Sequence, residues 1–361
     1  MSDAVPASRP AEIRALTGLR GVAALYVVLF HSRCVGDISS ATAALFAHGY
    51  VAVDLFFVLS GFVMAMTAAP LFETKVRLEN FRYFLGLRLA RIYPLFALMT
   101  VLTFGLVRNG ERSPADLVFN LLLVHSWGLA TTIIATGWSI SAEWAAYLVF
   151  PWLSRLANRV TPWLSAVLVA AIFAGLAAIA YGPSVLAGGA GAEHAGPLNI
   201  SSPNGPGALI RCLGEFILGL LAWRWRRLVP SAAALPVLAV ALGLVCWPGS
   251  DLLLVAAFAL LIMSLSHDRG LVARALGSAV PHYLGDVSYA LYLGHVLMAL
   301  IVAGGLDSWN AGWPQVVRVG LLVALSLGFA ALLHHGLEIR ARRTLRRWLA
   351  ATAIPAAAPV S

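Results

Sequence analysis

The stretch LTGLRGVAALYVVLFHS at residues 16–32 places an arginine and a histidine inside an otherwise apolar run of helical length. An ionisable side chain at membrane depth is costly and usually belongs to a functional site. Arg20 and His31 are eleven positions apart, which is three helical turns within about 20°, so both side chains share one helix face about 16 Å apart. This face therefore presents basic groups at two depths of a membrane.

The composition indicates that the rest of the 361-residue chain also lies largely in a membrane. Hydrophobic residues make up 60% of the chain and charged residues 11%, and the mean hydropathy is +0.84. A soluble domain would carry about a quarter charged residues, so these values exclude a soluble globular protein. The sequence predicts an all-α, polytopic membrane protein.

Ten segments are long and apolar enough to cross a bilayer as helices. An additional segment at 115–134 is short, contains Asn120 and His125, and ends in a Thr- and Gly-containing run, so it can cross, re-enter or lie on the surface. The ten predicted spans are residues 16–34, 49–68, 89–107, 139–154, 161–181, 208–223, 231–247, 251–266, 283–304 and 315–335.

The distribution of the 25 Lys and Arg residues favours one topology. When 115–134 does not cross and the N-terminus is cytoplasmic, most of these residues lie inside, including clusters at 75–91 and 340–347. The positive-inside rule therefore predicts about ten transmembrane helices, both termini cytoplasmic, and one re-entrant or interfacial segment near 115–134. The net charge of +9 follows from this orientation, and we expect no nucleic-acid partner.

The sequence predicts a single membrane domain. We assign residues 13–340 to the transmembrane domain and residues 1–12 and 341–361 to short cytoplasmic tails. No internal repeat is visible, which disfavours the inverted-repeat transporters. The three Cys residues have no metal-like spacing, and we expect no metal.

In this topology His31, Asp54 and Glu143 fall in the outer part of the first, second and fourth spans. A carboxylate at the depth of His31 can orient the imidazole and raise its basicity. Asp54 and Glu143 are the candidates for that role, although each can instead be half of a structural ion pair. Arg211 and Glu215, at i and i+4, are expected to form such a pair.

The inner side carries a different set of polar residues. Arg88 and Arg91 are three apart at the entry of the third span, and two adjacent guanidinium groups suit a phosphate or pyrophosphate. Ser288, Tyr292 and His295 form a stripe at i, i+4 and i+7 that can line a channel between the two depths. The alternatives are arginines that snorkel to lipid headgroups and a stripe that only joins helices by hydrogen bonds.

Five motifs in order resemble those of the integral-membrane acyltransferase family 3. The first is LTGLRG at 16–21 followed by His31, which is similar to the family's Leu-Asp-Gly-Leu-Arg-Gly and its histidine. The resemblance covers residues 13–340. The other four motifs are GYVAVDLFFVLSGF at 49–62, RLARIYP at 88–94, WSISAE at 138–143 and LGDVSYALYLGHV at 284–296.

Two positions depart from the family pattern. Thr17 stands where the family usually has Asp, and Glu338 lacks the Pro that closes the family's Glu-x-Pro. The first change removes a carboxylate or leaves its role to Asp54. We therefore do not include Glu338 among the expected functional residues.

The resemblance implies transfer of an acyl group, most often acetyl, from cytoplasmic acyl-CoA (acetyl-CoA) as co-substrate to a hydroxyl outside. The acceptor would be a glycan, a lipid-linked saccharide or another molecule. The resemblance also implies a multi-pass protein of the bacterial inner membrane. Arg20, Arg88 and Arg91 would hold the coenzyme A phosphates. The expected partners are therefore acyl-CoA, the acceptor and the lipid bilayer.

The same resemblance makes His31 the general base, oriented by Asp54 or Glu143, a role that typically contributes about 10²- to 10⁴-fold. A covalent relay through Ser60 or Ser141 is an alternative to direct transfer. The oxyanion donor and the pore or acceptor site would come from Trp138, Ser139, Ser288, Tyr289, Tyr292 and His295.

Two other classes use the same residues differently. A permease or flippase for an anionic or lipid-linked substrate would bind it with the arginines and use His31 as a proton carrier. A glycosyltransferase using a polyprenyl-linked sugar would need a carboxylate in an early outer loop, where Asp37 stands alone. The motifs and the absent repeat favour the acyltransferase.

Overall fold

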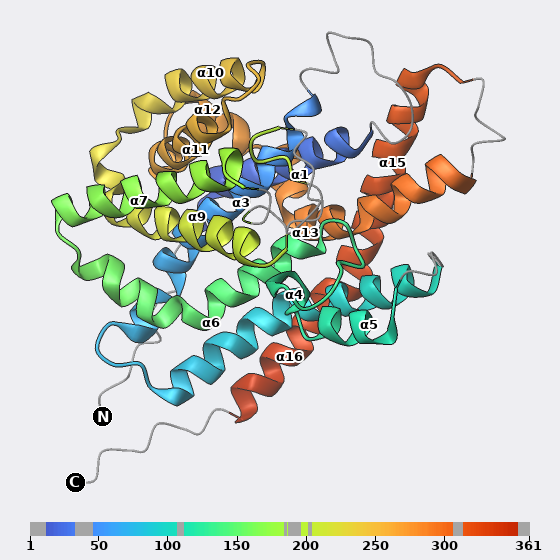
Figure 1. The fold of residues 1–361 in the computed structure, drawn as a ribbon, viewed down its shortest axis with the longest axis horizontal. Helices are drawn as coiled ribbons and strands as arrows, with labels where there is room; N and C mark the ends of the chain where they lie inside the picture. The colour runs from blue at the N-terminus through green and yellow to red at the C-terminus, as the bar shows by residue number, and fades with distance from the viewer. Residues whose placement is uncertain are drawn as a thin grey trace.

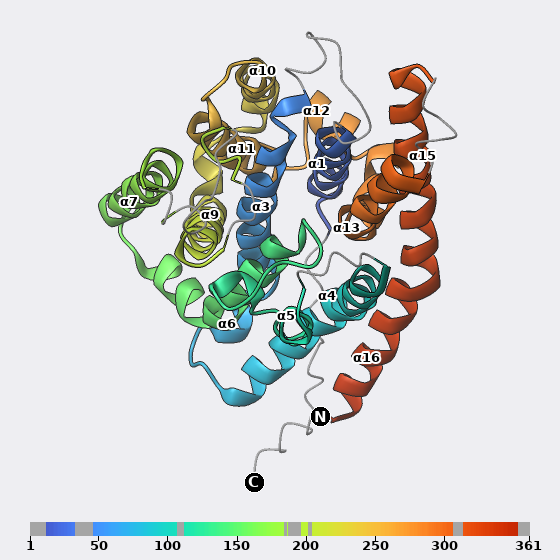
Figure 2. The same ribbon diagram turned by 45° about the vertical axis from the view of Figure 1, so that its right-hand side comes forward.

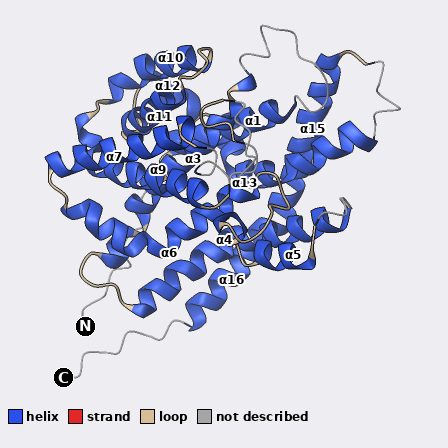
Figure 3. Ribbon diagram, in the orientation of Figure 1, coloured by secondary structure: helices blue, strands red, loops and turns tan. Residues whose placement is uncertain are grey.

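The computed structural model describes residues 12–32, 46–106, 112–183, 186, 196–200, 204–305 and 313–352. Helices are the only regular secondary structure among these residues, and turns and loops connect them without any β-strand (Figure 3). Asp37 lies outside the described residues. The main helices are α1 (Arg14–His31), α3 (Ala52–Thr67), α4 (Leu78–Leu106), α5 (Pro114–Leu121), α6 (Gly137–Arg159), α7 (Pro162–Tyr181), α9 (Pro206–Trp225), α10 (Ala234–Val245), α11 (Asp251–Leu265), α12 (Leu271–Leu276), α13 (Ala279–Leu300), α15 (Gln315–Leu333) and α16 (Ile339–Thr352).

Six helical stretches among the described residues are long and apolar enough to cross a membrane. Two further apolar helices, Ser231–Val245 and Asp251–Leu265, are shorter. The all-helical membrane fold predicted from the sequence is confirmed, whereas the count of ten spans and the side of the termini stay predictions. The six stretches are Gly49–Thr67, Leu78–Leu106, Pro162–Tyr181, Pro206–Leu228, Ala279–Ala303 and Gln315–Leu349.

The segment at 112–136 contains no helix of spanning length. Its α5 has eight residues, or about 12 Å, and begins at a capping box between Ser113 and Asp116. A short 3-10 turn at His125–Trp127 follows and ends at Gly128, whose positive φ of 91° reverses the chain. The segment therefore folds back instead of continuing as a helix.

Two close helix pairs form the centre of the molecule, α1 with α13 and α3 with α9 (Figures 1 and 2). A methyl group on Gly21 would lie 2.3 Å from the Gly285 nitrogen, and one on Gly61 would lie 2.0 Å from the Phe216 carbonyl oxygen. Small residues let backbones approach this closely where lipid supplies no hydrophobic drive. These two pairs set the distances between the polar side chains of the site.

The C-terminal part of the chain turns from α15 through a π-helical turn, His334–Glu338, into α16. Residues 341–352, which we assigned to a cytoplasmic tail, continue this basic helix and pack against α4 (Figure 2). The contact is close, because a methyl group on Gly86 would lie 2.7 Å from Leu349. The described part of the expected tail is therefore ordered structure.

Candidate functional site

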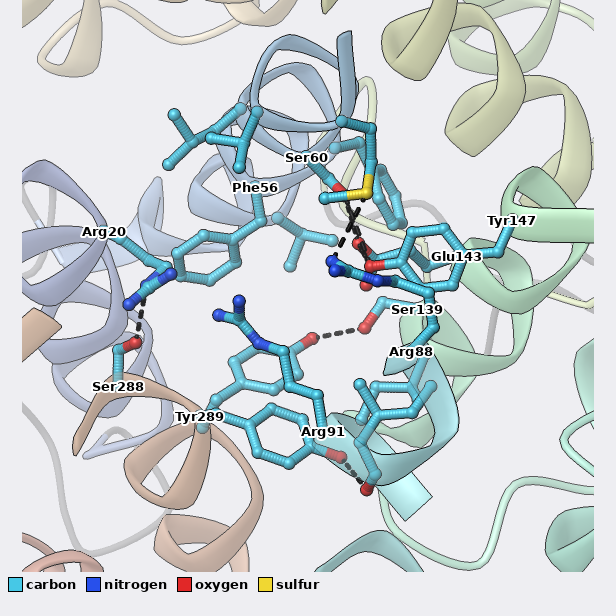
Figure 4. A pocket seen from close by; sticks show the side chains of 18 residues that line it. Arg20, Phe56, Ser60, Arg88, Arg91, Ser139, Glu143, Tyr147, Ser288 and Tyr289 are labelled. Carbon is cyan, nitrogen blue, oxygen red and sulfur yellow. Dashed lines mark hydrogen bonds between the residues drawn. The ribbon is translucent and has the colours of Figure 1, made fainter. Parts of the chain in front are cut away.

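Three arginines from two helices surround a cavity of about 130 Å³, which we call the arginine cavity. Arg20 comes from α1, and Arg88 and Arg91 come from one face of α4 (Figure 4). Arg20 donates from Nε to Ser288 Oγ at 2.9 Å and from Nη2 to the Gly285 carbonyl at 2.7 Å. None of the three forms an ion pair with a described carboxylate. Their charges remain available to an anion.

Glu143 lines the arginine cavity and is engaged by hydroxyl groups. It accepts hydrogen bonds from Ser60 and, at 2.6 Å, from Tyr147, which lies one helical turn further along α6. The structure therefore does not place Glu143 against His31, where we expected it. Of the two serines considered for a covalent relay, Ser60 lines this cavity, whereas Ser141 is buried and donates to the Leu123 carbonyl.

The second cavity, which we call the outer cavity, has a volume of about 380 Å³. His31 and Tyr50 line one part of it, and Trp138 from the start of α6 lines another. Residues Leu198–Ile200, which belong to the connection between α7 and α9, also line this cavity and form part of its wall. A cavity of this size is in the range that proteins use for small molecules.

His31 is paired with His295 instead of a carboxylate. His295 Nε2 lies 3.2 Å from His31 Nδ1, and each Nδ1 lies 3.0 Å from the carbonyl four residues earlier, Leu291 for His295 and Val27 for His31. A carbonyl only accepts, so both Nδ1 atoms carry hydrogen, and the neutral His295 can accept at Nε2. This network assigns the His31 lone pair to Nε2, on the other side of its ring.

Asp54 forms a buried ion pair with Arg211 of α9. The two carboxylate oxygens accept from Arg211 Nε at 2.6 Å and Nη2 at 2.7 Å, and Arg211 Nη1 donates to the Leu198 carbonyl at 2.8 Å. Asp54 is therefore committed to an arginine and does not orient His31. The expected pair between Arg211 and Glu215 does not form, since no ion pair joins them and both buried Glu215 oxygens have no hydrogen-bond partner among the described residues.

Among the residues that the structure describes, only Val53 and Tyr292 line both cavities, and we call them the partition. The Tyr292 hydroxyl is 2.8 Å from Ser139 Oγ, which lies on the arginine-cavity side, and donates at 3.3 Å to the Thr136 carbonyl. Because Tyr292 is held by α6, the partition is fixed by two helices, α13 and α6.

The stripe predicted on the ninth span is distributed along the two cavities. Ser288 and Tyr289 line the arginine cavity, Tyr292 belongs to the partition, and His295 reaches His31. Tyr289 also donates from its hydroxyl to the Ile92 carbonyl at 2.6 Å, which ties α13 to α4.

Two site residues were missed by the sequence reasoning. Tyr147 is detectable in retrospect as the i+4 neighbour of Glu143 on a helix. Arg112 lines the outer cavity from a position two residues before α5, and nothing in the sequence pattern marks that loop residue.

One cluster outside both cavities has ligand atoms close enough for a cation, namely Glu12, His282 and Asp286. His282 contacts Glu12 through Nε2 at 3.1 Å and Asp286 through Nδ1 at 3.6 Å. Each imidazole nitrogen therefore already has its own carboxylate. The cluster is largely exposed, and we assign no metal to it.

The chain is similar to known acyltransferases over nearly its whole length. A family model described as an acyltransferase domain matches residues 13–335. "Acyltransferase MdmB" of Streptomyces mycarofaciens is 32% identical over 383 aligned positions, which cover 94% of this chain and 94% of that protein. "Exopolysaccharide production protein ExoZ" of Rhizobium meliloti is 27% identical, covering 84% and 92% of the two chains. No solved structure matches significantly.

Proposed function

This chain belongs to the acyltransferase family whose domain model matches residues 13–335, and from this membership we propose that it carries an acyl group across a membrane. In this proposal acyl-CoA, in the simplest case acetyl-CoA, is the donor on the cytoplasmic side. The acceptor is a hydroxyl of a saccharide or similar molecule on the other side. The exopolysaccharide named for one relative supports a saccharide acceptor.

The observation that carries the proposal is the pair of cavities that meet at Val53 and Tyr292. One cavity is lined by three arginines and the other by His31. A donor with several phosphates and a reactive end at a distance requires this separation of anion binding from proton transfer. A soluble acyltransferase would have no need to place the two functions at different membrane depths.

The arginine cavity supplies the chemistry for the anionic part of the donor. Arg20, Arg88 and Arg91 carry guanidinium groups that have no carboxylate partner among the described residues, and such groups bind phosphate oxygens. Tyr289 and Ser288 add hydroxyls beside them. The donor's slender arm then has to pass the partition to bring its thioester to His31.

His31 acts as the general base. Its Nε2 takes the proton from the acceptor hydroxyl while the oxygen forms a bond to the thioester carbonyl carbon. Collapse of the tetrahedral intermediate breaks the carbon–sulfur bond, and His31 returns the proton to the leaving thiolate. His295 accepts from His31 Nδ1–H and so keeps the correct nitrogen free. The Tyr292 hydroxyl lies at the partition and serves as the oxyanion donor when it exchanges the Thr136 carbonyl for the oxyanion.

The decisive experiment measures binding and transfer of radiolabelled acetyl-CoA by the purified protein. We expect His31→Gln to lose transfer by about 10²- to 10⁴-fold while donor binding persists, because the base acts only in the chemical step. Arg91→Ala should instead weaken donor binding by about tenfold or more, the cost of a lost charge-assisted contact.

A matched control is Arg155→Gln, which removes an exposed arginine bonded to the Thr74 carbonyl outside both cavities. This variant should behave like the unmodified protein. Absence of acetyl-CoA binding to the folded protein would remove this proposal and favour a permease or flippase. Label retained on denatured protein, and lost in Ser60→Ala, would replace direct transfer by an acyl-serine relay.

A further inference from the structure

The lining of the outer cavity is electrostatically one-sided. It contains Arg112, Arg211 and His31, and no Asp or Glu is among the described residues that line it. Arg211 is neutralised by the bidentate contact with Asp54. The positive charge that remains in the cavity wall is therefore that of Arg112.

Arg112 has one nitrogen that protein groups do not satisfy. Its Nη1 is buried and has no hydrogen-bond partner in the described part of the chain. A buried cationic nitrogen without a partner costs free energy, and the cost is recovered when an anion enters. The guanidinium fork is shaped for a carboxylate or phosphate.

The position of Arg112 is fixed by the segment that folds back at 112–136. The next residue, Ser113, donates from its backbone nitrogen to Asp116 Oδ2 at 2.8 Å, and Asp116 Oδ1 accepts from the Thr131 nitrogen at 3.0 Å. Asn120 then binds the Thr131 carbonyl at 2.8 Å. These bonds join the two ends of the segment, so Arg112 and the wall residues Thr132, Ile133, Ala135 and Thr136 form one unit.

We propose that the outer cavity binds an acceptor with a carboxylate or phosphate group, and that Arg112 pairs with this group while His31 faces the hydroxyl to be acylated. This inference rests on the proposed function, because only that function makes the bound molecule an acceptor. A uronic acid or a phosphorylated sugar has the required chemistry. The cavity's hydroxyl and amide groups, such as Tyr50, Thr132 and Asn199, suit the remaining sugar hydroxyls.

The test compares methyl glucuronide with methyl glucoside, two probes that differ in a carboxylate at one carbon. Diethyl pyrocarbonate modifies a free imidazole nitrogen, and mass spectrometry of the full-length protein in nanodiscs gives the modification rate at His31. We expect the glucuronide to protect His31 from modification. The glucoside should need about a tenfold higher concentration for the same protection, which is the ratio expected for one charge-assisted pair.

Arg112→Gln should make the two probes equivalent, whereas Arg112→Lys should keep part of the preference because the charge remains. Arg155→Gln, with sodium chloride added to match ionic strength, is the control for general charge effects. Equal protection by both probes in the unmodified protein, or no protection by either, would overturn the inference. A glucuronide preference that survives in Arg112→Gln would overturn it too.

The same carboxylate can come from the transferred acyl chain, so the transfer assay includes acetyl-CoA and succinyl-CoA. Suppose that the unmodified protein prefers succinyl-CoA to acetyl-CoA, that this preference is lost in Arg112→Gln, and that the two glycosides protect His31 equally. The anion then belongs to the donor, and the inference is wrong. The two proposals fail separately. Glucuronide-selective protection through Arg112 without any acyl transfer would retain the anion site and remove the acyltransferase mechanism.

Discussion

The arginine cavity and the outer cavity share Val53 and Tyr292, yet the outer cavity leaves less of its buried charge unpaired, with Arg112 as the exception. In the arginine cavity, three guanidinium groups converge and no described carboxylate pairs with them. In the outer cavity, Arg211 is matched by Asp54, and His31 is matched by a second imidazole. Strong unpaired charge suits the binding of an anionic donor, whereas a proton-transferring group requires surroundings that do not fix its charge.

The largest expected effect concerns the neutralised charge of the outer cavity. Asp54→Asn leaves Arg211 buried without its counterion, which typically costs about 3–5 kcal/mol of folding free energy. We expect a lower thermal unfolding temperature in detergent. The double variant Asp54→Asn with Arg211→Gln should recover part of the loss, because no lone charge is then buried. A single variant as stable as the unmodified protein would show that the pair contributes no net stability.

The next effect tests whether an imidazole partner orients the base. His295→Leu removes one of the two acceptors at His31 Nδ1 and leaves the Val27 carbonyl at 3.0 Å. Because that hydrogen bond remains, we expect a loss of about tenfold in kcat, near the lower end of the 1.5–3 kcal/mol typical of a hydrogen bond to a charged group. KM for the acyl donor should not change, since the arginine cavity is untouched. His295→Gln, whose amide oxygen can accept, should retain more activity. Equal kcat for the two variants would mean that His295 only packs.

The smallest effect concerns the wall of the outer cavity. The backbone N–H of Ser113, then that of Thr131 and both hydroxyls, lower the pKa of Asp116 to about 2, from 3.8. Asp116→Asn should raise amide hydrogen exchange across 113–136 by a local cost of about 0.5–1 kcal/mol, the size of a lost cap at an exposed site.

The pH dependence has a defined sign. A pKa lowered by folding stabilises the segment above about pH 4, and this contribution is lost as the pH falls toward 2. The protection of the amides in 113–136, which is their exchange relative to the intrinsic rate at each pH, should therefore fall below pH 4 in the unmodified protein and change less in Asp116→Asn. The arginine cavity lies on long helices and should show no such change. Uniform exchange across both regions would contradict this difference.

The sequence predicted the helices better than the contacts between them. The expected spans 161–181 and 251–266 correspond to α7 at Pro162–Tyr181 and α11 at Asp251–Leu265, because hydropathy reports burial in lipid directly. By contrast, α4 already begins at Leu78, since its first turns are polar and hydropathy detects only the apolar part. The fold-back at 112–136 was left open, although its capping box is readable from Ser113 and Asp116.

For the site, the residues that share one helix face were predictable, and the way in which the helices pack against one another was not. The sequence predicted Asp54 and His31 at the same depth. A single sequence does not show that the face of α3 bearing Asp54 packs against α9, where Asp54 meets Arg211. The clustering of Arg20 with Arg88 and Arg91 required the same missing information and was supplied by family resemblance. Side chains on one helix, such as the stripe of α13, were placed well because helix geometry alone relates them.

The partition has an electrical consequence. In the proposed orientation, water enters the two cavities from opposite sides, so the membrane potential falls mainly across the short stretch around Val53 and Tyr292 instead of across the full bilayer. A charge that moves past these two side chains experiences most of the voltage. On the proposed function we therefore expect Tyr292→Ala to open this stretch and to produce a leak current that can be measured in liposomes containing the purified protein.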